Sequence, residues 1–245
     1  MRQKFLWMGV CCLVFASGAF ATIIQINYDA KFGLFGTVGR LHTTLNKRTK
    51  HYELETTVHL SGIAKALLKN HRERHISKGH YERGLMVSDL YQIIQHYSDT
   101  VTSKEYRIDH KRKHVIRRYR KWKHGKLVKE QTKTLNFYAK DDLLTLYFNL
   151  GKAIQKRGKT YHFKAVGLEK QKGQVRVSVP SATERSTYIK LLGNGAKLYA
   201  KALIYQKNFK HKKGDIFLSI TADGYVQKAV MKDILLYGDV KIVRR

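Results

Sequence analysis

Hydrophobic and polar side chains alternate along most of this chain. In the segment 51–60, every second residue would face the same side of a strand: Tyr52, Leu54, Thr56, Val58 and Leu60. The same period predicts strands within 23–45, 87–97, 160–166, 174–180, 188–192, 197–206, 215–221, 225–236 and 239–243. Two further strands are expected in 104–133, turning near His124 and Gly125, and Asp223-Gly224 is typical of a hairpin turn.

One segment departs from this period. Residues 139–153 read AKDDLLTLYFNLGKA, in which an apolar stripe recurs at helical spacing at Leu143, Leu146, Tyr147 and Leu150. Asp141 or Asp142 would cap the start of this helix, because a short carboxylate accepts hydrogen bonds from the first-turn N–H groups. Gly151 is the predicted end of the helix. We interpret the two aspartates as caps rather than as a catalytic carboxylate pair.

The combined pattern predicts a mainly β protein in which one curved antiparallel sheet wraps a central helix. Glycines at 33, 36 and 39 are the expected bends of the first strands. No fixed repeat and no linker interrupts the pattern, so residues 22–245 are predicted to form a single β-rich domain.

The first 21 residues have the composition of a signal peptide. Arg2 and Lys4 precede a short apolar run, and Ala19-Phe20-Ala21 fits the small-x-small cleavage rule. Cleavage is expected after Ala21, which predicts a periplasmic protein. The two cysteines of the chain both lie in this leader, so the exported domain would contain no disulfide.

The charge of the chain is strongly positive. It has 48 Lys and Arg residues against 18 Asp and Glu residues, a net charge of +30. Such a field attracts anionic partners, including an anionic lipid, a membrane surface or an envelope polymer; no specific nucleic acid is expected. The basic residues are densest in 104–133, where our candidate ligand-binding residues are Arg117, Arg118, Arg120, Lys121 and Trp122. The alternative is a solvated strand edge whose charges prevent aggregation.

Other candidate chemistry is sparse. His71 and His75 in HRERH are four residues apart, and His80 is nearby. The glutamate is not at the second position of the zinc-protease motif, however, and we interpret the segment as an exposed basic loop. Glu53 and Glu55 are expected on the solvent face of their strand rather than at a glycosidase site. Gly-x-Ser-x-Gly and Ser-x-x-Lys motifs are absent from the sequence. The sequence therefore predicts no catalytic residues, no metal and no cofactor.

Three stretches together resemble a known family: INYDAKFGLFGTVG, DDLLTLYFNL and DGYVQKAVMKDILLYGDVKIV. They are similar to the bacterial exported proteins catalogued as domain of unknown function 3108. The matching positions are Tyr28, Gly33, Gly36, Asp142, Leu143, Leu146, Tyr147, Tyr237 and Gly238. The chain has Asp142-Leu143-Leu144 where the family often has Asp-Pro-Leu. The resemblance implies a periplasmic β-rich protein with a half-barrel fold similar to that of lipoprotein carriers, and it implies no activity.

These observations predict a non-enzymatic cell-envelope protein that binds a lipid or another amphipathic anionic ligand. One alternative is a surface binder of polyanions, either acidic glycans or nucleic acid. Another is a structural partner in envelope assembly. Binding of polyanions should weaken steeply as salt increases, whereas a ligand held by buried apolar area should stay bound.

Overall fold

A computed structural model describes residues 21–62, 65, 71–168, 171–205, 214–234 and 238–245. The predicted signal peptide lies outside these residues, except for Ala21. The first strands are β1 (Thr22–Phe32), β2 (Thr37–Lys47), β3 (His51–Leu60), β4 (Arg72–Glu82), β5 (Leu85–Tyr97), β6 (Thr100–Asp109), β7 (His114–Lys123) and β8 (Lys126–Thr134). The later strands are β9 (Asp141–Asp142), β10 (Thr160–Val166), β11 (Gln174–Ser178), β12 (Leu198–Ile204), β13 (Gly214–Ile220), β14 (Val226–Ile234) and β15 (Gly238–Arg244). A 3-10 turn η1 (Gly33–Phe35) and helices α2 (Leu143–Ala153) and α3 (Arg185–Leu192) complete the described elements.

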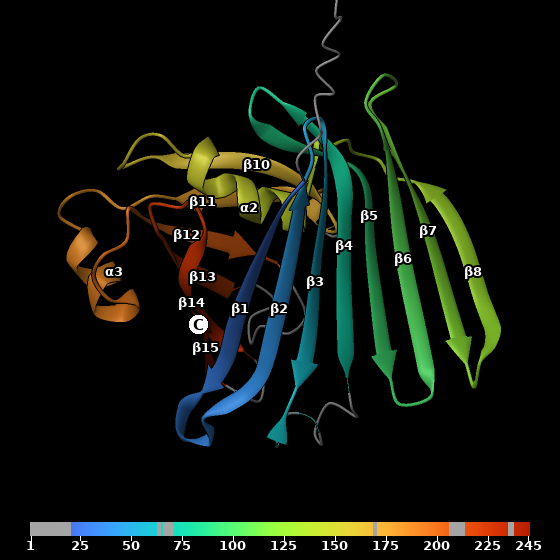
Figure 1. The fold of residues 1–245 in the computed structure, drawn as a ribbon, viewed down its shortest axis with the longest axis horizontal. Coiled ribbons are helices and arrows are strands. Elements are labelled where there is room, and N and C mark those ends of the chain that lie inside the picture. Colours follow the sequence, from blue (N-terminus) through green and yellow to red (C-terminus); the bar gives the residue numbers. More distant parts are fainter. Residues whose placement is uncertain (1–20, 63–64, 66–70, 169–170, 206–213, 235–237) are drawn as a thin grey trace, which may run out of the picture.

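All the described strands belong to one open sheet, in the order β8-β7-β6-β5-β4-β3-β2-β1-β15-β14-β13-β12-β11-β10-β9. Neighbours are antiparallel except the two-residue β9, which pairs in parallel with β10. We call β1–β8 the first wing and β9–β15 the second wing. Figure 1 shows the long strands of the first wing side by side, with the second wing curving behind them and α2 inside the bend. The predicted fold class, a curved sheet wrapped on a central helix, is confirmed.

Helix α2 forms part of the core on more than one side. Leu146 and Leu150 pack in a cluster with the second wing, whereas Phe148 packs with Ile26, Leu45 and other first-wing residues. The predicted burial of Leu146 and Leu150 is confirmed, and Leu143 and Tyr147 are partly buried against the same clusters. The apolar surface is wider than the single predicted stripe because both wings cover the helix.

The predicted helix end at Gly151 is wrong. The helix continues to Ala153, and the backbone N–H of Ile154 still donates to the carbonyl of Leu150. A Cβ at Gly151 would lie 2.6 Å from the backbone oxygen of Gly224 in the β13–β14 turn. The glycine is therefore required by the close approach of the second wing to the helix, and it does not cap the helix.

Residues 188–192 were predicted as a strand and instead belong to α3. Tyr188 and Leu192 are four residues apart, and both pack in a small cluster with Tyr199 and Val230 of the second wing. Ile189 also packs against this cluster, and a strand would turn it to the face opposite Tyr188, so the packing fits a helix. No helix in the described part of the chain is long and apolar enough to cross a membrane.

Candidate functional site

An apolar cavity of about 320 Å³ lies between α2 and the concave faces of both wings. Helix α2 contributes leucines to its wall, the first wing contributes Tyr28, Leu41 and Val58, and the second wing contributes Val177 and Leu218 among others. Strand alternation explains this lining, since the residues of each strand that face α2 are the apolar ones. The volume is at the lower end of the range of about 300–1,000 Å³ that is typical of small-molecule sites.

Few polar side chains line this cavity, and four of them, Thr43, Thr56, His75 and Tyr91, bond in two pairs. The hydroxyls of Thr43 and Thr56 lie 2.8 Å apart on β2 and β3. His75 Nδ1 lies 2.7 Å from the hydroxyl of Tyr91. Because these groups bond to one another, the wall presents a mainly apolar surface, and its best occupant is an apolar chain or ring.

The His75–Tyr91 pair extends into a partly buried polar row formed by His71 and the start of β4. His71 Nε2 lies 3.0 Å from Glu73 Oε2, and His75 Nε2 lies 2.7 Å from Glu73 Oε1. Burial would raise the pKa of Glu73, but hydrogen bonds with the two histidines outweigh burial and hold this pKa well below its usual range. The carboxylate thus remains charged inside the fold and separates the two imidazoles.

The prediction that HRERH forms an exposed basic loop is therefore wrong. Residues 72–75 begin β4, and the period of two turns Glu73 and His75 toward the concave face. Arg74 points to the opposite face and pairs with Glu55, with its Nε 2.6 Å from Glu55 Oε1. Glu55 and Glu53 both form ion pairs on the outer face, as the predicted strand alternation requires.

A second buried polar network holds the start of α2. Asp142 is fully buried; it accepts from the backbone N–H of Thr145 at 2.8 Å and from the hydroxyl of Ser77 at 2.5 Å. The hydroxyl of Tyr52 lies 2.9 Å from that of Thr145, so strands β3 and β4 both bond to the helix start. The predicted cap at Asp142 is confirmed, and the network fixes α2 against the first wing.

Asp141 is close to this network but has a different environment. Burial, followed by the nearby charge of Asp142, raises the pKa of Asp141 to about 7. Its Oδ1 accepts a hydrogen bond from Asn149 Nδ2 at 3.3 Å. The same Asn149 donates to the backbone oxygen of Met86 at 2.8 Å, which connects the middle of the helix to β5.

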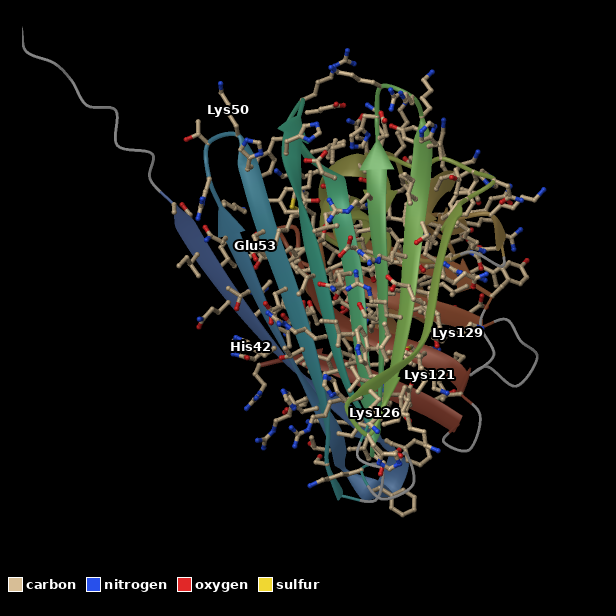
Figure 2. All side chains as sticks on the ribbon, turned by 90° about the vertical axis from the view of Figure 1, so that its right-hand side faces the viewer. His42, Lys50, Glu53, Lys121, Lys126 and Lys129 are labelled. Carbon is tan, nitrogen blue, oxygen red and sulfur yellow. The ribbon has the colours of Figure 1, made fainter. Side chains whose placement is uncertain are left out.

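The five predicted ligand-binding residues lie on β7, and strand alternation divides them between two faces. Arg117 pairs in register with buried Tyr106 and so lies on the concave side with Lys121; Arg118, Arg120 and Trp122 lie on the outer side. Arg118 and Arg120 both form ion pairs with Glu130 of β8. Figure 2 shows Lys121 with Lys126 and Lys129 toward the free end of this hairpin. None of the five lines the apolar cavity, and their role in binding stays a prediction.

Sequence reasoning missed the polar groups of the cavity wall. Thr56 was placed correctly on the apolar face of its strand. A threonine among those apolar residues could have indicated that its hydroxyl has a buried partner on the neighbouring strand. His75 and Tyr91 are 16 residues apart and meet only because β4 and β5 form a hairpin with that register. Their contact could not be read from local sequence patterns.

Comparison with known proteins gives a limited result. No family model and no curated protein matches this chain. Four chains of solved structures match it. One is the crystal structure of a beta-barrel-like protein of domain of unknown function DUF1849 from Brucella abortus, which is 11% identical over 90% of this chain and 94% of that chain, with a TM-score of 0.48. This distant likeness carries no information about a ligand, and membership of the family catalogued as domain of unknown function 3108 stays a prediction.

Proposed function

We propose that this protein is a non-enzymatic binder of a lipid or another amphipathic anionic ligand in the cell envelope. The observation that carries the proposal is the cavity of about 320 Å³, whose wall is formed by apolar side chains of α2 and both wings. Burying the apolar part of a ligand there gains about 25 cal/mol for each Å² removed from water. The envelope location rests on the predicted signal peptide.

The anionic character of the ligand rests on charge. The chain carries a net charge of +30, and such a field raises the local concentration of anionic amphiphiles near the protein. The cavity wall itself has no lysine or arginine among the residues described. The charged end of the ligand would therefore lie outside the apolar wall, where basic side chains and water solvate it.

Native mass spectrometry of the purified protein, with extraction of bound lipid, tests this proposal directly. A fluorescent fatty-acid probe then measures affinity in wild type and in Ala202→Phe, which places a ring in the cavity. Ala222→Phe is the matched control, because Ala222 is exposed in the β13–β14 turn. We expect at least about tenfold weaker binding in Ala202→Phe, since one lost contact of 1.4 kcal/mol already changes affinity tenfold. Equal affinity in both variants would contradict the proposal.

A second candidate function is polyanion binding at the sheet edge. Strand β8 is exposed along its whole length and carries Lys126, Lys129 and Lys133. Raising the salt concentration separates the candidates: binding of heparin as a model polyanion should fall steeply, and the fatty-acid probe should remain bound. Lys126→Gln with Lys129→Gln should weaken only the heparin interaction.

A further inference from the structure

A second cluster of side chains lies outside the cavity, near the β4–β5 hairpin. His80 is on β4, Asp89 is on β5, and His110 follows β6. The register places Lys78 opposite Leu90 and Gly79 opposite Ser88, so Asp89 is the extra residue of a β-bulge. A bulge redirects a side chain that regular pairing would point elsewhere. Here it brings a carboxylate between two histidines from different hairpins.

The three groups converge closely. Asp89 Oδ1 lies 3.0 Å from His80 Nδ1 and 3.2 Å from His110 Nε2. The candidate ligand atoms of the three residues all lie within 4.8 Å of one another. Ligand atoms about 2.0–2.1 Å from a tetrahedral zinc ion are about 3.3 Å apart, so small side-chain movements would admit the ion. The backbone oxygen of Ser88 is also close to this group of atoms, at 3.0 Å from His110 Nε2.

The outer nitrogen of each histidine also has an oxygen partner. His80 Nε2 lies 3.3 Å from Glu82 Oε1, and His110 Nδ1 lies 2.8 Å from the hydroxyl of Tyr138. Histidines that bind metals usually donate their second N–H to such an oxygen, which fixes the ring orientation and tautomer. The cation Lys140 pairs with Glu82 and not with Asp89; its Nζ lies 2.6 Å from Glu82 Oε2.

We propose that His80, Asp89 and His110 bind one zinc ion, with the fourth position taken by water or by the carbonyl of Ser88. Imidazole and carboxylate ligands suit zinc, and three protein ligands leave one position open. The ion would replace the protons now shared between the histidines and Asp89. This site differs from His71 and His75, which were the histidines weighed for metal binding in the sequence. It would join the β4–β5 hairpin to the turn after β6.

The experiment uses untagged full-length protein stripped with a chelator and titrated with Zn²⁺ by isothermal titration calorimetry. We expect about one ion per chain. Asp89→Asn and His110→Ala should each weaken binding at least about tenfold, and Glu82→Ala should weaken it about tenfold as well, because it removes the oxygen that contacts His80 Nε2 and loss of an outer partner typically costs 10–100-fold. His42→Ala is the control, since His42 is exposed on β2 and bonds to Asn27.

Two outcomes would overturn the proposal. The first is a wild-type protein that takes up no Zn²⁺ at a free concentration of about 0.1 mM, well above the dissociation constant expected of a three-ligand site. The second is unchanged binding in Asp89→Asn and His110→Ala. Circular dichroism checks that each variant is folded. If a ligand variant does not fold, the Glu82→Ala variant decides the question, because Glu82 is partly exposed and, of the proposed site, contacts only the outer nitrogen of His80. Unchanged Zn²⁺ affinity in folded Glu82→Ala would then overturn the proposal.

Discussion

The two wings of the sheet cover the same helix with different chemistry. The first wing buries the hydroxyls of Thr43, Thr56, Ser77 and Ser88, and the charged Glu73 is partly buried on the same side. Strands β10–β15 bury only Ser219 among the polar residues described, and their concave face is mainly valine, alanine, leucine and isoleucine. The first wing holds α2 by directional hydrogen bonds with Tyr52, Ser77 and Met86, whereas the second wing covers it with apolar contacts.

Helix α2 is attached to the two wings at different places. Asp142 accepts a hydrogen bond from Ser77 of β4, and Asn149 donates one to the backbone oxygen of Met86 in β5. At the other end of the helix, the backbone of Gly224 approaches Gly151 closely. The apolar cavity lies beside the leucines of α2 and is lined by residues of both wings. Each of the following substitutions changes a contact of one wing.

The largest effect is expected from Asp142→Ala. The change leaves Ser77 Oγ and the backbone N–H of Thr145 without their acceptor in a fully buried site. Each unsatisfied buried group costs about 1–3 kcal/mol, so we expect a loss of about 3 kcal/mol in the free energy of unfolding. Urea denaturation measures it. Asp142→Asn keeps the shape of the side chain and should lose less; equal losses in both variants would show that the hydrogen bonds are not the source.

Gly151→Ala tests the contact with the second wing. Alanine favours a helix by about 1 kcal/mol relative to glycine, so an unhindered site would be stabilised. Here the new methyl group meets the backbone of Gly224 at 2.6 Å, and overpacking of this kind costs about 1–3 kcal/mol. We expect a net loss of about 1 kcal/mol in thermal or urea unfolding. Lys152→Ala, at the next and exposed position, is the control and should change stability little.

Asp141 should make stability depend on pH. Its pKa is about 7 in the folded protein and about 3.9 in an unfolded chain, so the folded state binds a proton more tightly. The contribution of Asp141 to the free energy of unfolding is fully present below about pH 4 and is lost as the pH rises to about 7. Asp141→Asn should remove this dependence on pH. At pH 8 its free energy of unfolding, measured by urea denaturation, should exceed that of wild type by about 1 kcal/mol. Parallel stability curves from pH 4 to 8 would contradict the assignment.

The smallest effect is expected on the outer face of the first wing. Arg74 donates two hydrogen bonds to Glu55, at 2.6 and 2.7 Å, and both side chains are partly exposed. Such pairs contribute about 0.2–1 kcal/mol. A double-mutant cycle of Arg74→Gln with Glu55→Gln should give a coupling energy of about 0.5 kcal/mol that decreases in high salt. A coupling energy of several kcal/mol would mean that this face is less exposed than the structure shows.

Local patterns predicted much of the fold. The alternation around Leu54 located β3 to the residue, and the spacing of Leu146 and Leu150 located the helix and its buried side. Asp142 was predicted as a cap because its role depends on neighbours three residues away. Each of these features is decided within a few residues of the chain.

The errors have a different physical origin. Gly151 lies inside the helix, where a side chain would clash with the backbone of Gly224, which is 73 residues further along the chain. HRERH begins a strand in which Glu73 is partly buried, since two histidines compensate for the loss of water around its charge. The cavity and the group around Asp89 depend on strand register and on a bulge. Contacts between distant segments decide these features, and a single sequence does not encode them in any local period.

The order of the strands also has a consequence for how the chain folds. Every neighbouring pair in the sheet is consecutive in the sequence except β1 and β15, where Tyr28 lies opposite Arg244. Each wing can form by successive short loop closures, which are fast, whereas the β1–β15 seam must close a loop of almost the whole chain. The seam therefore forms last, after β15 has been synthesised, and until then β1 is a free edge. The two wings, and the cavity between them, come together in that final step.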